Sequence, residues 1–274
     1  MYSGLLFSNE PLFYEIILFV AIVVAICVFF LLFFIPAGYG RHIDNKWSLK
    51  IPNRLGWFIM EIPTVVIFAL CFIFSDKWSS WTHISFLLIW NAHYVHRVFI
   101  YPLIIKNGKK LPVTIISMGF IFNVVNTYLQ GRWLFTLSDP QYSSDLLFPL
   151  SPINYSNVDW LYSPIFLFGL VLFIVGYFIN KQSDLILRNL RTESNQRYKI
   201  PNQGLYRFVS CPNYLGELLE WLAWAIMTWS LPGTVFFIWT TANLLPRSIS
   251  HHKWYHEHFD NYPDNRKALI PFLL

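Results

Sequence analysis

Charged residues are scarce in this sequence. Asp, Glu, Lys and Arg make up only 13% of its 274 residues, whereas soluble domains carry roughly 25%. So few charges do not cover a surface that faces water, which excludes an ordinary soluble domain and also a disordered chain. Hydrophobic residues reach 55% and the mean hydropathy is +0.44, so the composition indicates a polytopic membrane protein.

Cysteine and glycine signatures are missing as well. The sequence has three cysteines and no C-x-x-C pair, which excludes a disulfide framework and a cysteine-based zinc site. Its 12 glycines form neither G-x-G-x-x-G nor G-x-x-x-x-G-K-[ST], which excludes a Rossmann fingerprint and a P-loop. Two histidine pairs have metal-ligand spacing, but no H-x-x-H-H box accompanies them, so we expect no metal site. These pairs are His93-x-x-His96 and His252-x-x-x-His256.

Seven apolar stretches are candidates for membrane helices, which need about 20 residues each. The sequence contains no internal repeat and no linker that would divide it. We therefore expect an all-α integral membrane protein with seven transmembrane helices and a single membrane-embedded domain over residues 1–274. The stretches are residues 13–35, 57–74, 84–105, 113–129, 160–179, 215–230 and 233–246.

Basic residues are distributed unequally between the two sides of this arrangement. The loops 36–56, 106–112 and 180–214 and the end 247–274 hold 17 of the 20 Lys and Arg residues. Because loops rich in Lys and Arg stay in the cytoplasm, we expect the N-terminus outside and the C-terminus in the cytoplasm. An alternative function for the basic loop 180–214 is to tether the protein to anionic lipid head groups.

Several polar residues inside the stretches need an explanation, because ionisable groups are costly there and by default suggest function. Glu61 lies four residues after Trp57, and burial at that place favours its protonated form. A structural hydrogen bond between helices is the alternative for Glu61. Tyr94, Arg97 and Tyr101 recur with helical spacing, so the third stretch has one polar face.

Two further polar sets with helical spacing lie near the C-terminus. For the set within residues 247–255, the alternative is an amphipathic tail that lies on the lipid surface. The first set is Asn213, Glu217 and Glu220, and the second is Arg247, His251 and Tyr255.

The sequence resembles the steroid 5α-reductase family, whose relatives include the polyprenol reductases. The likeness is specific over residues 176–274, extends over 90–131, and before residue 80 rests on Trp57-Phe-x-x-Glu61. The runs that carry it are GLYRFVSCPNYLGELLEW, which ends at Trp221, and HHKWYHEHFDNYPDNRKALIPF, which begins at His251.

The resemblance implies an enzyme that takes hydride from NADPH and transfers it to the β-carbon of an enone, typically a 3-oxo-Δ4-steroid. It implies that Glu61 and Tyr94 hold the carbonyl oxygen of the substrate and that Trp57 also binds substrate. The expected partners are an apolar steroid or lipid and the membrane, without nucleic acid. The implied cofactor contacts are Arg97, Lys109, Asn180, Asp184, Arg191, Tyr198, Lys199, Asn213, Glu217, Arg247, His251 and Tyr255.

General chemistry agrees with this assignment. Hydride addition to an enone places negative charge on the carbonyl oxygen, and preorganised donors in a dry site stabilise that charge best. A tyrosine together with a neutral carboxylic acid is one solution to this problem. Two alternatives stay open at this point: the same chemistry on a polyprenol-type or enoyl lipid, and a seven-span receptor or transporter without chemistry.

Overall fold

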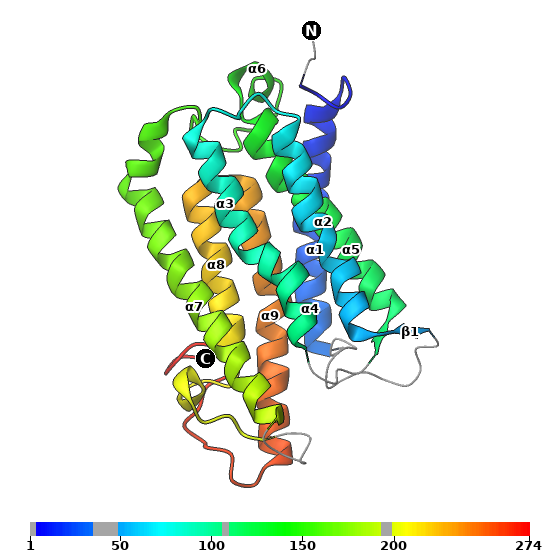
Figure 1. Ribbon diagram of the computed structural model, residues 1–274, viewed down its shortest axis with the longest axis vertical. Coiled ribbons are helices and arrows are strands. Elements are labelled where there is room, and N and C mark those ends of the chain that lie inside the picture. The colour runs from blue at the N-terminus through cyan, green and yellow to red at the C-terminus, as the bar shows by residue number, and fades with distance from the viewer. Residues whose placement is uncertain (1–3, 35–48, 106–109, 193–198) are drawn as a thin grey trace. The chain divides into compact units, whose positions relative to one another are not determined.

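Helices make up most of the chain in the computed structural model, which describes residues 4–34, 49–105, 110–192 and 199–274, without the side chains of 191 and 192 (Figure 1). Within these residues one short ladder joins strand β1 (Lys50–Ile51) to strand β2 (Leu111–Pro112) in antiparallel register. The helical segments in chain order are α1 (Glu10–Phe34), α2 (Asn53–Ile73), α3 (Trp81–Val95), the π-helical η2 (His96–Ile100), α4 (Tyr101–Ile104), α5 (Val113–Arg132), the π-helical η3 (Trp133–Leu137), α6 (Pro140–Ser143), the 3₁₀ turn η4 (Val158–Tyr162), α7 (Pro164–Thr192), the 3₁₀ turn η5 (Gly204–Arg207), α8 (Pro212–Thr228) and α9 (Leu231–His258).

Four helical segments of the described chain are long and apolar enough to cross a membrane, namely Glu10–Phe34, Asn53–Ile73, Val113–Leu137 and Pro164–Leu190. They coincide with the first, second, fourth and fifth stretches expected from the sequence. The other three stretches also fall on helices, which are α3 to α4, α8 and α9. The protein is therefore of the all-α membrane type, whereas the seven spans and the sides of the two termini stay predictions.

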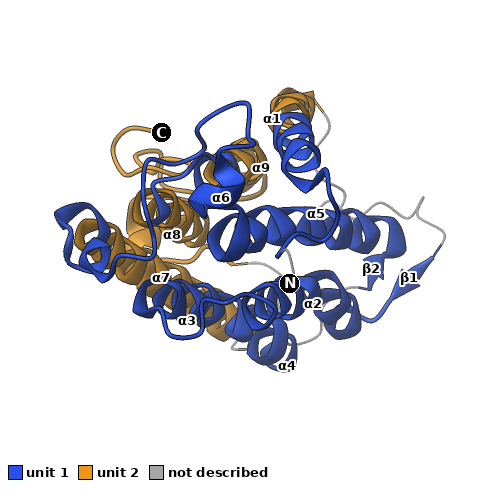
Figure 2. Cartoon of the chain, turned by 90° about the horizontal axis from the view of Figure 1, so that it is seen from above, with its two compact units in different colours: residues 1–21, 38–166, 228–235 blue, residues 22–37, 167–227, 236–274 orange. Residues whose placement is uncertain are grey.

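The chain divides into two compact units that interleave along the sequence (Figure 2). Unit 1 contains residues 1–21, 38–166 and 228–235, and unit 2 contains residues 22–37, 167–227 and 236–274. Three of these boundaries fall inside α1, α7 and α9, and a fourth precedes the last residue of α8, so at these places the units are joined by a helix. The single domain expected over residues 1–274 stays a prediction.

In unit 1, α2 and α5 pack closely against each other, and glycines permit the close approach. A Cβ atom on Gly56 would lie 2.7 Å from a side chain of α5, and one on Gly131 would lie 3.0 Å from a side chain of α2. A Cβ atom on Gly119 would lie 2.4 Å from Met60 Sδ. Asn123 follows Gly119 by one helical turn and therefore lies on the face of α5 that meets α2.

A buried ion pair fastens the beginning of α1 to the end of α5. Arg132 donates from Nε and Nη2 to the two oxygens of Glu10, at 2.7 Å each. Its remaining bonds go to Gly4 O at 2.7 Å and to Thr136 Oγ1 at 3.0 Å, while Tyr128 donates its hydroxyl to Glu10 at 3.1 Å. Both charged side chains are buried, and each has several partners, which is what a buried pair requires.

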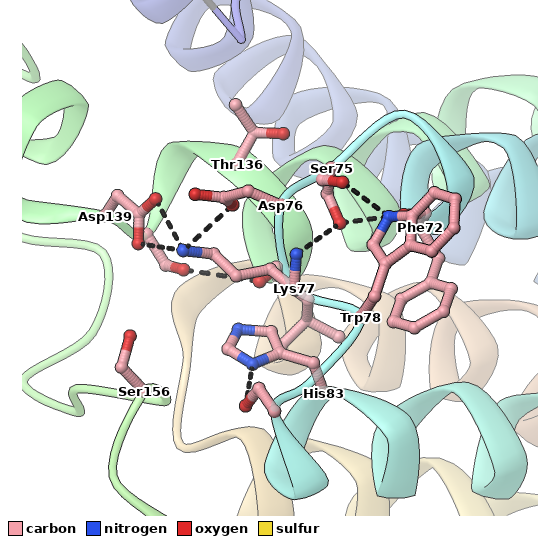
Figure 3. Close-up of polar contacts among 12 residues, drawn as sticks. Phe72, Ser75, Asp76, Lys77, Trp78, His83, Thr136, Asp139 and Ser156 are labelled. Carbon is pink, nitrogen blue, oxygen red and sulfur yellow. Dashed lines mark hydrogen bonds and ion pairs between the residues drawn. The ribbon is translucent and has the colours of Figure 1, made fainter.

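A second ion pair lies at the turn between α2 and α3, where Figure 3 shows the Lys77 ammonium between Asp76 and Asp139. Lys77 Nζ is 2.8 Å from both oxygens of Asp139 and 3.3 Å from Asp76 Oδ1. Burial alone lowers the pKa of Lys77, but the hydrogen bond and charge of Asp139, with Asp76, outweigh burial and raise that pKa above its ordinary 10.5. The pair therefore joins this turn to the residue before α6.

In unit 2, α7 and α8 approach each other through two glycines. A Cβ atom on Gly176 would lie 2.7 Å from Gly216 O, and one on Gly216 would lie 2.5 Å from the backbone N of Asn180. Both contacts are with backbone atoms, which do not move aside as a flexible side chain does. The crossing point fixes Asn180 on α7 relative to Asn213, which lies at the beginning of α8.

The two sequence runs that carry the family resemblance are held together in unit 2. The C-terminal segment pairs with the residues before α8, since Ser210 N donates to Lys267 O at 2.8 Å and Lys267 N donates to Phe208 O at 2.9 Å. Ser210 Oγ also lies 2.6 Å from His252 Nδ1. Arg266 donates to Pro201 O at 2.9 Å, so the tail secures the loop that precedes α8.

The break between α8 and α9 corrects one detail of the sequence analysis. The sequence places Leu231-Pro232 between the last two helices, but these two residues form the first turn of α9. Trp229 and Ser230 make the break, and Trp229 adopts a left-handed backbone with φ of 43°. Proline suits the first turn of a helix because its missing N–H is not needed there. The helix then continues through Pro246 to His258, well past the expected end at 246.

Candidate active site

Glu61 lies in the middle of α2, where the helix carries a proline. Pro63 has no N–H to donate to the carbonyl of Ile59, so the backbone ladder is incomplete around Glu61. Thr64 Oγ1 donates to Glu61 O at 2.7 Å and supports the helix there. The Glu61 residue is only 5% exposed, so its carboxyl is buried in a weakened turn.

Two helices supply hydrogen-bond donors to this carboxyl. Arg97 Nη2 donates to Glu61 Oε1 at 3.1 Å, and Asn123 Nδ2 lies 3.4 Å from Glu61 Oε2. The same Asn123 amide donates to Met60 O at 2.8 Å. Both oxygens of the Glu61 carboxyl therefore have a donor nearby, while its protonated form stays a prediction. Asn123 was not identified from the sequence, although an amide within an apolar stretch is a signal for it.

Arg97 projects from the π-helical turn η2, a type of turn that often occurs at functional sites. Its guanidinium lies 4.7 Å from the ring centroid of Trp57 and 5.8 Å from that of Tyr101. Trp57 Nε1 is buried and has no hydrogen-bond partner among the residues that the structure describes. The structure therefore brings the expected residues Trp57, Glu61 and Arg97 together, with a spare indole N–H beside them.

Tyr94 belongs to an aromatic column that links α2 to α3. Its ring lies 4.6 Å from Trp90, which stacks on Phe68 at 4.6 Å. Trp90 Nε1 donates to Thr64 O at 2.9 Å and so connects the column to the turn after Glu61. Tyr94 is 4% exposed. Packing of this kind holds a ring in one orientation, as a residue that positions a substrate requires.

In unit 2, a cluster of amides and one carboxylate forms where α7 meets α8. Asn180 Nδ2 donates to Asn213 O at 3.0 Å, and Asn213 Nδ2 lies 3.4 Å from Asp184 Oδ1. Asn180 is 2% exposed, and its Oδ1 has no partner among the described residues. A buried acceptor without a donor is costly, so this atom is suited to a donor on a bound molecule.

The beginning of α8 also contacts the C-terminal half of α9. Arg247 donates to Tyr214 Oη at 3.0 Å and to Asn243 Oδ1 at 2.9 Å. Tyr214 Oη lies 3.3 Å from His251 Nε2. The helical spacing of Arg247 and His251 is confirmed, since both reach the same tyrosine. Tyr214 was not identified from the sequence, although it directly follows Asn213 in the specific run.

The other expected cofactor residues have varied surroundings. Glu217 is half-buried on α8, one turn after Asn213. Tyr255 is buried with its ring stacked on Tyr262 at 5.0 Å. Lys199 is exposed. Arg191 lies in α7, but its side chain falls outside the described part of the chain, as do Lys109 and Tyr198 altogether.

The chain is similar to known proteins over most of its length. A family model described as 3-oxo-5-alpha-steroid 4-dehydrogenase matches residues 109–274. Steroid 5-alpha-reductase DET2 of Gossypium hirsutum is 39% identical over 273 residues, which cover 97% of this chain and 99% of the relative. The 3-oxo-5-alpha-steroid 4-dehydrogenase 1 of Rattus norvegicus is 36% identical over 242 residues, which cover 88% of this chain and 87% of the relative. The chain therefore belongs to the 3-oxo-5-alpha-steroid 4-dehydrogenase family, whose members are oxidoreductases that act on CH–CH groups.

Proposed function

We propose that this protein reduces the C=C bond of an apolar enone, a 3-oxo-Δ4-steroid, with hydride from NADPH. Membership of the family supports the reaction type. The observation that supports it best is the buried Glu61 carboxyl, with Arg97 on one oxygen and Asn123 near the other. The Arg97 guanidinium lies against Trp57, whose buried indole N–H has no partner among the described residues. Buried hydrogen-bond donors in a site without bulk water are what a developing oxyanion needs.

In this proposal the carbonyl oxygen of the substrate is held by Tyr94 and Glu61. Hydride addition at the β-carbon leaves an enolate, and a proton at the α-carbon completes the reduction. The Tyr94 hydroxyl donates to the enolate oxygen, and the aromatic column keeps its ring in place. The Trp57 N–H is a third donor, one turn of α2 before Glu61.

Glu61 donates to a carbonyl oxygen only while its carboxyl carries a proton. Arg97 and Asn123 are donors to that carboxyl, and such donors favour its ionised form. The proposal therefore requires Glu61 to take up a proton when substrate binds. In the wild type KM should then rise with pH, and this dependence should disappear in Glu61→Gln, whose amide donates at any pH.

NADPH, when bound, supplies the hydride, and we propose that unit 2 provides most of its contacts. The unpartnered Asn180 Oδ1 accepts a hydrogen bond from an amide or amine of the cofactor, and Arg247 provides positive charge for its phosphates. An acceptor at Asn180 and a positive charge at Arg247 fit a cofactor that carries both phosphates and an amide. The proposed contacts are Asn180, Asp184, Arg191, Tyr198, Lys199, Asn213, Glu217, Arg247, His251 and Tyr255, with Arg97 and Lys109.

We also propose that these cofactor residues face the cytoplasm, where NADPH is supplied. The support is the charge distribution, because 17 of the 20 basic residues lie in loops assigned to that side. Reporter fusions after residue 140 and after residue 274 should report opposite sides of the membrane. If both fusions report the same side, the number of spans or the orientation is wrong.

The main test is NADPH oxidation by purified protein with a panel of steroid, polyprenal and enoyl substrates. We expect a 3-oxo-Δ4-steroid to be reduced, with deuterium from labelled NADPH at its β-carbon. Asn213→Ala and Arg247→Ala should weaken NADPH binding by roughly 10- to 150-fold, the effect of a lost buried or charge-assisted hydrogen bond. Reduction of polyprenals alone would overturn the substrate assignment, and no NADPH binding would overturn the proposed function.

A further inference from the structure

Tyr214 connects two of the proposed cofactor residues through a single oxygen atom. Arg247 Nη2 donates to Tyr214 Oη at 3.0 Å, and His251 Nε2 lies 3.3 Å from the same oxygen. The Arg247 guanidinium also lies 5.2 Å from the centroid of the Tyr214 ring. A single hydroxyl on α8 therefore contacts two residues that lie one turn apart on α9.

The directions of these hydrogen bonds follow from the chemistry of the three groups. Arginine has only donors, so Tyr214 Oη must accept from Arg247. The tyrosine then has its own proton to donate, and His251 Nε2 is the nitrogen beside it. When the tyrosine donates to His251, the neutral ring accepts at Nε2 and carries its own proton on Nδ1. A charged His251 would instead point a second cationic donor at the oxygen that Arg247 already occupies, which is unfavourable.

Arg247 is restrained from a second side. Its Nη1 donates to Asn243 Oδ1 at 2.9 Å, so Asn243 and Tyr214 together fix the plane of the guanidinium. A guanidinium held in one plane loses less conformational freedom when it binds a phosphate. The Tyr214 hydroxyl therefore restrains both Arg247 and His251 before the cofactor binds.

We propose that Tyr214 is a positioning residue of the cofactor site, which orients Arg247 and fixes His251 in its neutral, Nδ1-protonated form. This inference rests on the proposed NADPH site and adds a residue to it. Tyr214 need not touch the cofactor itself, because it acts through the two residues that it holds.

The test is NADPH affinity of Tyr214→Phe, measured by direct binding in detergent or nanodiscs across a range of pH. The variant keeps the ring and loses only the hydroxyl. At pH 8 we expect roughly 10-fold weaker binding, the cost of one lost hydrogen bond to a charged group. As the pH falls below about 6.5, the freed His251 should become protonated and attract the anionic cofactor, so the deficit should shrink.

Two controls separate positioning from general damage. Tyr177→Phe removes a hydroxyl from a half-buried tyrosine of α7 in the same unit and should bind NADPH like the wild type at every pH. In a His251→Asn background, Tyr214→Phe should cost less than in the wild type, because residues in one hydrogen-bond network are not additive.

Distinct outcomes would overturn the inference and the proposed function. If Tyr214→Phe binds like the wild type, or if its deficit is constant with pH and additive with His251→Asn, the positioning role is wrong. If the variant does not fold, the nitrogen chemical shifts of isotope-labelled His251 in the wild type decide the matter, and a proton on Nε2 overturns the inference. If the wild type does not bind NADPH, the proposed function itself fails.

Discussion

Two buried glutamate–arginine pairs occur in unit 1, and they are built differently. In the first, Arg132 reaches both oxygens of Glu10 at 2.7 Å, and the two side chains are 4% and 0% exposed. In the second, Arg97 reaches one oxygen of Glu61 at 3.1 Å, and the side chains are 16% and 6% exposed. The first pair is short and bidentate, whereas the second is longer and is flanked by aromatic rings.

The surroundings explain the difference. Arg132 also donates to a backbone carbonyl and a hydroxyl, and Glu10 also accepts from a tyrosine hydroxyl. This pair is therefore suited to hold α1 against α5. Near Glu61 lie the Asn123 amide and the Arg97 guanidinium, which is itself flanked by the rings of Trp57 and Tyr101. The same two residue types therefore form a closed structural pair in one place and, in the proposed function, part of the substrate site in the other.

The largest expected effect comes from breaking the first pair. Arg132→Met leaves Glu10 buried without its cation, which typically costs about 3–5 kcal/mol. Unfolding in detergent should show this loss, and Arg97→Met should lose less because its guanidinium is less buried. The double variant Glu10→Gln with Arg132→Met should recover part of the loss. Equal losses for Arg132→Met and Arg97→Met would contradict the comparison.

Next in size is the loss of a donor to the substrate oxygen. Tyr94→Phe should lower kcat by roughly 10²–10³, or about 2.7–4 kcal/mol, while the fold and NADPH affinity are kept. Glu61→Gln should lower kcat less, because its amide still donates to the oxygen. Because the proposed function places both groups on one oxygen, the double variant should cost less than the sum of the two. Steady-state kinetics on the best substrate measures this. Normal turnover by Tyr94→Phe would show that the Tyr94 hydroxyl takes no part in the reaction and that the ring only packs against its neighbours.

A smaller effect is expected for Asn123, whose amide lies 3.4 Å from Oε2 of Glu61 in the second pair. Asn123→Leu should lower kcat/KM by about 10-fold, as expected for one lost hydrogen bond to a charged group. It should also move the rise of KM to higher pH, because one donor that favours the ionised Glu61 is gone. Asn91→Leu is the matched control, since Asn91 donates within its own helix to Leu87 O. An unchanged pH profile in Asn123→Leu would make Asn123 a purely structural residue.

The smallest effect concerns the Lys77–Asp139 pair at the α2–α3 turn, shown in Figure 3. The folded protein raises the pKa of Lys77 above 10.5, so the stabilisation is fully present below pH 10.5 and is lost as the pH rises through the folded value. Lys77→Met should cost about 1 kcal/mol at pH 7, as expected for a partly exposed pair. The difference in unfolding temperature from the wild type should vanish at strongly alkaline pH. A difference that persists there would have another cause.

Much of the fold was predictable because it depends on local properties of the chain. The length and apolar character of a membrane helix are contained in consecutive residues, so all seven expected stretches fall on helices. The helical spacing of Arg247 and His251 was readable for the same reason. The functional importance of Glu61 was inferred from the cost of a carboxyl in an apolar stretch, which also needs no tertiary information.

The tertiary structure decided which residues meet, because those contacts join positions far apart in the chain. Glu61 and Arg97 are 36 residues apart, and Tyr214 and His251 are 37 apart, so neither pairing follows from helical spacing. Asn123 reaches Glu61 only because α5 packs closely on α2, which Gly119 allows, and Tyr214 reaches Arg247 and His251 only because the chain brings α9 beside the beginning of α8. Sequence pattern determines which face of a helix is polar, but the contacts across helices depend on backbone approach at a few ångströms, and only the folded chain defines that distance.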